Sequence, residues 1–249
     1  MSDSARADDG DRVPLEPPSA ADSVSAALGS AARRAGLDPA QHSSTGAAVW
    51  SAMGGVRGIL ESVLPSLAFV VLFTITTDPE TRQGNLPLSL GVSVGLALVF
   101  TIARLVAKSP PSAAIGGLVA TVAAALLALF TGRGQDNFVL GFFTNGAYGA
   151  AFLVSVLVGW PLIGLIAGYL LGEGTSWRSD KRKRRVYSLL SLGWAALFAA
   201  RLIVQLPLYF AGDVTALGTL KIVMGLPLFA PLLAVTWLAV RALSPRRDS

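Results

Sequence analysis

Six long apolar segments constrain the fold of this chain more than any other feature of the sequence. They lie at about 59–76, 86–106, 112–131, 138–158, 188–210 and 217–240. Each holds close to the roughly 20 residues that a helix needs to cross about 30 Å of hydrocarbon. A backbone in hydrocarbon must satisfy its own hydrogen bonds, and the alternating pattern of a membrane barrel is missing. The sequence therefore predicts an all-α, polytopic membrane helix bundle with six transmembrane helices.

The composition agrees with this class of protein. Charged residues make up 14% of the chain, against about 25% in an average soluble domain. The net charge of +5 would suit a nucleic-acid binder, but the basic residues flank apolar runs. That placement fits anionic lipid headgroups better, and we expect no nucleic-acid partner. The chain has no cysteine, which excludes disulfides and thiolate chemistry.

The residues on either side of the spans predict two tails. Residues 1–44 begin with an acidic stretch rich in Pro and Ser that lacks the apolar core of a signal peptide. We expect this segment to be a disordered cytoplasmic tail, because it has little apolar area to bury. The six-helix domain then occupies 45–243, and 244–249 form a short basic cytoplasmic tail.

One further apolar piece, WPLIGLIAGYLLG, follows the fourth span. Pro161 is expected to break or kink a helix that enters from this span. The segment 161–172 is too short to cross a bilayer, so we expect an extra short helix there. Re-entrant, interfacial and fourth-helix-continuation placements all stay open.

The distribution of Lys and Arg predicts the orientation. With six spans and a cytoplasmic N-terminus, nearly all basic residues outside the spans fall on the inner side. Only Arg82 and Arg133 fall outside. A seventh span at 161–172 would reverse this bias, which contradicts the positive-inside rule. We therefore expect a multi-pass protein of the bacterial plasma membrane with both termini in the cytoplasm.

A basic run occupies the inner loop expected at 173–187. It comprises Arg178, Lys181, Arg182, Lys183, Arg184 and Arg185. The run is typical of a topology signal that also anchors the loop to anionic lipid headgroups. Docking to an acidic cytoplasmic partner is the alternative.

Signatures of catalysis are scarce in this sequence. There is no phosphate-binding loop, no pair of histidines and no Gly-x-Ser-x-Gly elbow. We predict a protein that is not an enzyme, with no catalytic residue, no metal site and no cofactor.

Polar residues deep in the apolar spans are the strongest candidates for a site. Arg201 lies about ten residues from the outer end of the fifth span, and Gln205 shares its helix face at i+4. Asn145 lies at a similar depth in the fourth span, with Tyr148 one turn below. We predict one buried polar cluster of these four residues. It is either a site for an anionic ligand or lipid headgroup, or a hydrogen-bonded clamp that fixes helix register.

Two other features concern packing and the membrane interfaces. Glu61 and Lys221 lie near the ends of the first and sixth spans, as interfacial charges. Gly91 and Gly95 form a small-xxx-small pair, and Gly164, Gly168 and Gly172 form two overlapping pairs. Such spacing favours close helix packing, either within the chain or with a second copy or another membrane protein.

Several stretches carry a resemblance to a known family. They are GVRGILESVLPSLAFVVLF, TGRGQDNFVLGFFTNGAYG, SVLVGWPLIG, GEGTSWRSD, RLIVQLPLYF and KIVMGLPLF. They resemble the actinobacterial membrane family catalogued as domain of unknown function 3159, over about residues 45–243. That family has no established activity.

The second half is also distantly similar to the intracellular septation protein A family. The likeness lies in Pro161 and Leu162, in Trp177 of the polar loop, and in LSLGWAALF with Trp194. This resemblance implies a role in cell division and envelope integrity. It supplies no catalytic residue.

Two functional hypotheses follow from these observations. The first is a non-enzymatic plasma-membrane protein that acts in envelope or division processes through helix and lipid contacts. The second is a small transporter or channel with an anion-accommodating cavity around Arg201.

Overall fold

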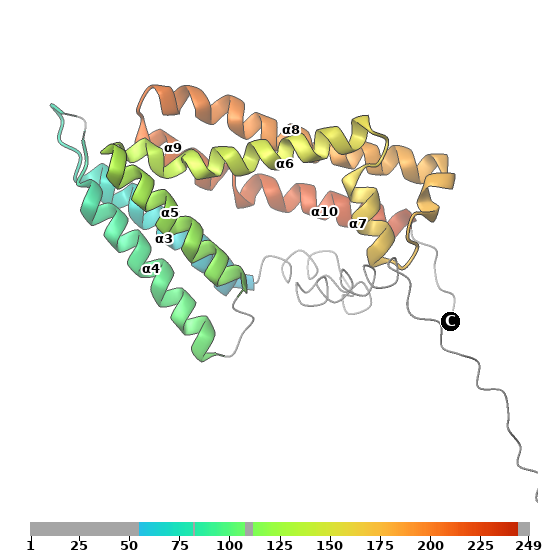
Figure 1. The fold of residues 1–249 in the computed structure, drawn as a ribbon, viewed down its shortest axis with the longest axis horizontal. Coiled ribbons are helices and arrows are strands. Elements are labelled where there is room, and N and C mark those ends of the chain that lie inside the picture. The colour runs from blue at the N-terminus through green and yellow to red at the C-terminus, as the bar shows by residue number, and fades with distance from the viewer. Residues whose placement is uncertain (1–54, 82, 108–111, 244–249) are drawn as a thin grey trace, which may run out of the picture.

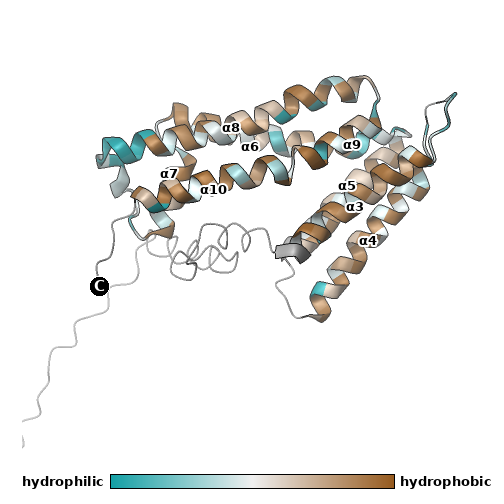
Figure 2. Cartoon of the chain, turned by 180° about the vertical axis from the view of Figure 1, so that it is seen from behind, coloured by the Kyte–Doolittle hydropathy of each residue, from teal (hydrophilic) through white to brown (hydrophobic). Residues whose placement is uncertain are grey.

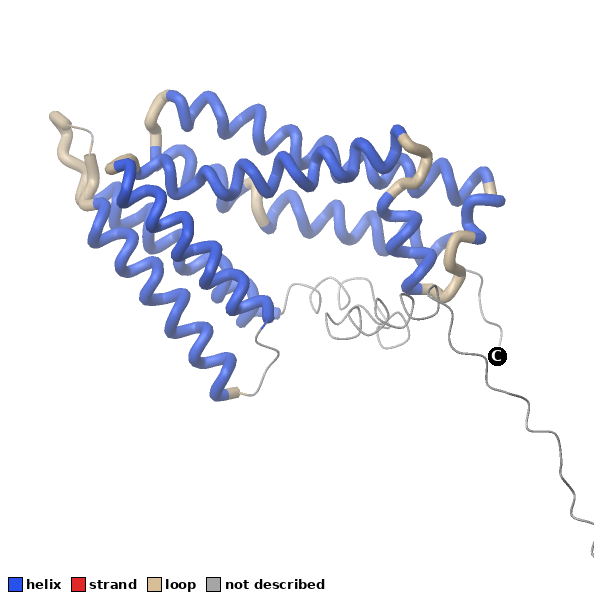
Figure 3. The backbone as a smooth tube through the Cα atoms, viewed as in Figure 1, coloured by secondary structure: helices blue, strands red, loops and turns tan. Residues whose placement is uncertain are grey.

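The computed structural model describes residues 55–81, 83–107 and 112–243. Every regular element within these residues is a helix, as Figure 3 shows. The predicted all-α fold is therefore confirmed. The tails expected at 1–44 and 244–249 lie outside the described residues.

The helices follow the predicted spans closely. In chain order the elements are α3 (Gly55–Ile75), α4 (Leu86–Val106), α5 (Ser112–Thr131), the 3-10 turn η1 (Gly134–Phe138), α6 (Val139–Leu157), α7 (Leu162–Leu170), the 3-10 turn η2 (Ser176–Ser179), α8 (Lys181–Phe210), α9 (Val214–Val223) and α10 (Leu226–Leu243). Six helical segments of the described chain are long and apolar enough to cross a membrane. The prediction of six transmembrane helices is thus confirmed.

The sixth span is broken into α9 and α10, which the sequence analysis did not predict. Pro227 has no N–H to donate to the carbonyl of Val223, and its ring would clash there in a continuous helix. Gly225 lies at the break, where a side chain would be too close to the preceding helical turn. A Cβ on it would lie 2.9 Å from the carbonyl oxygen of Lys221. The chain therefore ends one helix at Val223 and starts another at Leu226.

The fifth span begins earlier than predicted, because the basic run is helical. The Asp180 side chain accepts hydrogen bonds from the backbone N–H groups of Arg182 (2.7 Å) and Lys183 (3.2 Å). This N-cap starts α8 at Lys181. The loop predicted at 173–187 is correspondingly shorter, and its basic residues form the first turns of a helix.

The short segment after the fourth span is a separate helix, α7, with nine residues. Its first free N–H groups are satisfied by hydroxyls of two other helices. Leu162 donates to Ser155 Oγ at 3.1 Å, and Ile163 donates to Ser191 Oγ at 3.2 Å. These bonds and the contacts with α8 hold α7 against the bundle. The expected extra short helix is present, and it ends at Leu170.

The six spans form two groups of three that meet at one end (Figure 1). In the first group α4 contacts both α3 and α5, and in the second α8 contacts α6, α9 and α10. The groups join where α9 packs on α3 and η1 packs on α5. Their helix axes diverge from this junction, as Figure 1 shows.

Close packing of small and aromatic residues holds this junction together. The Phe69 ring of α3 lies 5.9 Å from the Phe138 ring of η1, and both side chains are buried. Gly218 of α9 faces Val70 of α3, where a Cβ would lie 2.0 Å from Val70 Cγ2. Only a glycine at this position lets the two helices approach so closely.

The outward faces of the helices are apolar (Figure 2). Phe130 and Phe210, for example, are 87% and 81% exposed. A water-soluble protein does not expose so many large apolar side chains over so wide an area. These faces therefore fit a surface covered by lipid.

The predicted small-xxx-small pairs behave differently from one another. A Cβ on Gly91 or Gly95 would meet nothing within 4 Å, so this pair makes no close contact inside the described chain. Gly164 and Gly168 instead press on Trp177, where a Cβ would lie 2.9 Å and 2.7 Å from the indole. Intramolecular packing thus accounts for the pair in α7.

Replacing Gly218 should weaken the junction between the two groups. Gly218→Ala forces Val70 or the helix backbone to move, and such overpacking costs about 1–3 kcal/mol. We expect a lower thermal unfolding midpoint of the detergent-solubilised protein. Gly91→Ala is the matched control and should leave the midpoint unchanged. Equal midpoints for the two variants would contradict the role of the α3–α9 contact.

Candidate functional site

Arg201 lies near the level of the break in the sixth span. Trp194 Nε1, two turns earlier on α8, donates to Thr236 Oγ1 of α10 at 3.0 Å. Gly193 beside it packs against Leu232. Because α8 and α10 run antiparallel, the two turns from Trp194 to Arg201 correspond to the two turns from Thr236 back to Phe229. Arg201 therefore lies level with the first turn of α10, close to the break.

Lys221 brings a second positive charge to the same place. It follows Val214, Leu217 and Gly218 along the buried face of α9, at the i, i+3, i+4 and i+7 positions. Its Nζ lies 5.4 Å from the centre of the Phe138 ring. α9, which carries Lys221, packs against α8, which carries Arg201. Lys221, predicted as an interfacial charge, thus joins the candidate site.

Gln205 adds an amide to these two cations. Its side chain is 4% exposed, and its Nε2 has no hydrogen-bond partner among the described residues. Arg201 Nε, one turn away on the same helix face, also has no hydrogen-bond partner among the described residues. A buried donor without a partner costs about 1–3 kcal/mol. Because these atoms are donors, the missing partner is an acceptor.

No acidic side chain balances this site within the described residues. Neither Arg201 nor Lys221 forms an ion pair there. Arg104, in the last turn of α4, contrasts with them, because it forms an ion pair with Glu61 of α3. Glu61, predicted as an interfacial charge, is thus the counter-ion of a different arginine.

Asn145 and Tyr148, the other two members of the predicted cluster, form no hydrogen bond with Arg201 or Gln205 in the described part of the chain. Asn145 is 8% exposed, and its Nδ2 donates to the carbonyl of Gly141 in its own helix at 2.7 Å. Tyr148 is 59% exposed, and its ring stacks on Phe198. The prediction that Tyr148 belongs to a buried cluster is wrong, because the rotation of α6 turns this residue outward.

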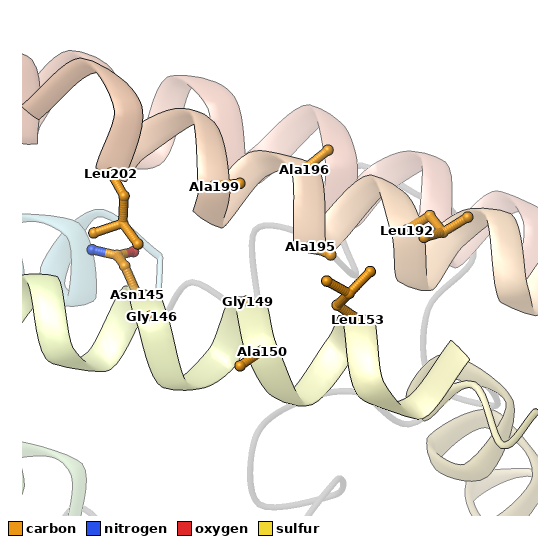
Figure 4. Close-up of a pocket in the computed structure, with 10 residues that line it drawn as sticks. All are labelled: Asn145, Gly146, Gly149, Ala150, Leu153, Leu192, Ala195, Ala196, Ala199 and Leu202. Atoms are coloured by element: carbon orange, nitrogen blue, oxygen red, sulfur yellow. The ribbon is translucent and has the colours of Figure 1, made fainter. Parts of the chain in front are cut away.

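Asn145 lines an open groove between α6 and α8 (Figure 4). The groove has a volume of about 410 Å³, and its wall is almost wholly apolar. Small residues make up much of that wall: Gly146, Gly149, Ala150, Ala195, Ala196 and Ala199. Asn145 faces Leu202 across it, whereas Arg201 and Gln205 are not among the residues that line it. The groove is therefore separate from the cationic site.

The sequence analysis missed a buried carboxylate at the junction. Asp136 of η1 is 4% exposed and accepts a hydrogen bond from Tyr209 Oη at 2.7 Å. Arg133 Nη2 lies 3.4 Å from the same carboxylate oxygen. Tyr209 follows Arg201 and Gln205 on one face of α8, at i+4 and i+8. That periodicity is the only signal in the sequence that links Tyr209 to the deep site.

The basic run has both internal and exposed members. Lys183 Nζ lies 2.7 Å from Glu173 Oε2, and the Arg178 guanidinium lies 3.6 Å from the centre of the Trp160 ring. These two residues hold the turn after α7 in place. The exposed members on the first turns of α8 are Lys181, Arg182, Arg184 and Arg185.

Groups of three or more His, Cys, Asp or Glu side chains placed to hold a metal ion do not occur in the described part of the chain. The deep site consists of cations and an amide, so its chemistry suits an anion and not a metal ion.

Comparison with known proteins gives one family. The model of the family described as Protein of unknown function (DUF3159) matches residues 53–247. No curated protein and no solved structure matches the chain. The similarity to the septation protein A family stays a prediction.

Loss of the Tyr209 hydroxyl should destabilise the junction. Tyr209→Phe keeps the ring against Phe142, 5.5 Å away, but it takes a donor from the buried Asp136. We expect a loss of about 1–3 kcal/mol, measured as the unfolding midpoint in detergent. Tyr148→Phe, which removes an exposed hydroxyl, is the control and should change nothing. Equal effects of both variants would show that the bond to Asp136 contributes no stability.

Proposed function

Because the chain belongs to the family described as Protein of unknown function (DUF3159) and carries six membrane-spanning helices, we propose that it is a non-enzymatic anion-binding protein of the membrane. The anion occupies the site formed by Arg201, Gln205 and Lys221. The protein acts as a small transporter or channel for that anion.

Two partly buried cations, for which the described residues supply no counter-ion, carry this proposal. A charge near the bilayer centre costs about 2.5–3.5 kcal/mol on insertion scales. Lys221, on the helix that packs against α8, adds a second positive charge for which the described residues supply no counter-ion. A clamp that served only to fix helix register would need a counter-charge, as Arg104 has in Glu61. A bound anion supplies the counter-charge for Arg201 and Lys221.

The broken span supports the same function. Discontinuous helices that meet inside the bilayer form the ligand and ion sites of many transporters. Here the break lies between Val223 and Leu226, next to Lys221 and near the level of Arg201. The site therefore has the local backbone of a transport site as well as the charge.

A role in envelope or division processes is the second candidate. The four exposed basic residues at the start of α8 favour it, because they can hold anionic lipid headgroups. We place this helix end, and with it both chain termini, on the cytoplasmic side of the bacterial plasma membrane. Arg104 and Arg241 lie in the last turns of α4 and α10. Both helices end on the cytoplasmic side in this topology, as the positive-inside rule expects.

Removing Arg201 should separate a ligand site from a structural clamp. Arg201→Leu deletes a partly buried charge that has no counter-ion among the described residues, so we expect the unfolding midpoint without added anion to stay the same or rise. Stabilisation by sodium phosphate, and phosphate flux in proteoliposomes, should be lost. Arg104→Leu is the control, and it should lower the unfolding midpoint because it removes the ion pair with Glu61.

The opposite result has a clear meaning. If Arg201→Leu destabilises the protein as much as Arg104→Leu does, and phosphate has no effect on the unsubstituted chain, Arg201 is a clamp and the proposal fails.

The orientation can be tested with single cysteines, since the chain has none of its own. Ser179→Cys, beside the basic turn, should react with a membrane-impermeant maleimide only in inside-out vesicles. Thr81→Cys, in the loop after α3, should react in intact cells. The reverse pattern would overturn the proposed topology.

The lipid role has its own readout in the same membranes. Changing Lys181, Arg182, Arg184 and Arg185 to Gln should lower the amount of anionic lipid that co-purifies with the protein. Unchanged lipid content would remove the observation that favours the second candidate.

A further inference from the structure

Resting on the anion site proposed above, we propose that this site selects a doubly charged oxyanion, such as sulfate or hydrogen phosphate, over singly charged anions. The inference concerns the class of ligand. It is carried by the number of charges at the site, by the type of donors that face it and by the backbone at the helix break.

The charge at the site is the first argument. Arg201 and Lys221 bring two positive charges from two different helices, and no described carboxylate pairs with either. A single chloride would leave one buried charge without compensation. The cost of an uncompensated ion in a low-dielectric medium is several kcal/mol. A dianion balances both positive charges, so a low-dielectric surrounding favours a dianion over a monoanion at this site.

The donors are the second argument. Arg201 carries a planar fork of N–H groups, Lys221 carries three N–H groups on a point charge, and Gln205 Nε2 carries two more. Gln205 is only 4% exposed, and its Nε2 has no hydrogen-bond partner among the described residues. The guanidinium fork matches two oxygens of a phosphate or sulfate group at once. A tetrahedral oxyanion offers further oxygens to the ammonium and the amide, whereas a halide offers one centre to all three.

The backbone at the break is the third argument. α10 has 18 residues, and its N-terminus lies at the break. Its free N–H groups are those of Leu226 and Leu228, because Pro227 has none and the N–H of Phe229 donates to the Gly225 carbonyl. Such free groups carry partial positive charge. Helix N-termini bind phosphate and sulfate for this reason. The opposite end of α9 carries Lys221 in its last turn, where the partial negative charge of the carbonyls stabilises the ammonium group.

The test compares anions of different charge on the purified full-length chain. The protein is held in an uncharged detergent, and sodium sulfate, sodium phosphate, sodium chloride or sodium nitrate is added at matched ionic strength. Unfolding midpoints give an apparent affinity for each anion. We expect at least tenfold tighter binding of sulfate and phosphate than of chloride and nitrate.

The variants sharpen this comparison. Lys221→Met leaves one charge, so it should remove the tenfold preference and keep weak binding of chloride. Arg201→Leu should abolish the response to every anion. Sulfate also stabilises proteins by exclusion from their surface, and any response that persists in Arg201→Leu measures that general effect and is subtracted.

The outcomes separate the two proposals. If no anion acts beyond the Arg201→Leu background, the proposed function fails. If chloride and nitrate bind as tightly as sulfate and phosphate, the site binds anions but the inference about charge fails. An arm with phosphatidic acid tests the source of the phosphate group. Stabilisation by this lipid alone, with no effect of inorganic phosphate or sulfate, overturns a free oxyanion as the ligand.

Discussion

The interior of a bilayer offers neither hydrogen-bond partners nor counter-ions, and this constraint accounts for much of the local structure. The start of α7 uses the hydroxyls of Ser155 and Ser191 in place of water. The indole of Trp194 donates to Thr236, and the amide of Asn145 donates to its own helix. The chain thus supplies hydrogen-bond partners for these deep polar groups itself. The bonds between helices also fix which helix faces meet.

The same constraint makes the cationic site stand out. Arg201, Gln205 and Lys221 lie on α8 and α9, and they collect donors and positive charge for which the described residues supply no counter-ion. The chain shows at Arg104, in the last turn of α4, that an arginine can be balanced by a carboxylate from a neighbouring helix. The absence of such a partner from the described residues around Arg201 is therefore better explained by a ligand than by packing.

Hydropathy and length were enough to predict the six spans and the short helix after the fourth, because both depend on local sequence alone. The depth of Arg201 also followed from its place along its span. The true members of the site did not follow, because membership depends on helix rotation and on contacts between distant segments. Gly218 against Val70 fixes the rotation of α9 and turns Lys221 inward, and the rotation of α6 turns Tyr148 out to the surface.

The break in the sixth span links the site to the arrangement of the two groups. Gly225 and Pro227 let α9 pack on α3 of the first group while α10 packs on α8 of the second. Lys221 is therefore tied to the first group through α9, and Arg201 belongs to the second through α8. A ligand shifts a conformational equilibrium only through contacts that differ between the states. An anion held by both cations makes such contacts, because any separation of α9 from α8 would remove one of its two charges.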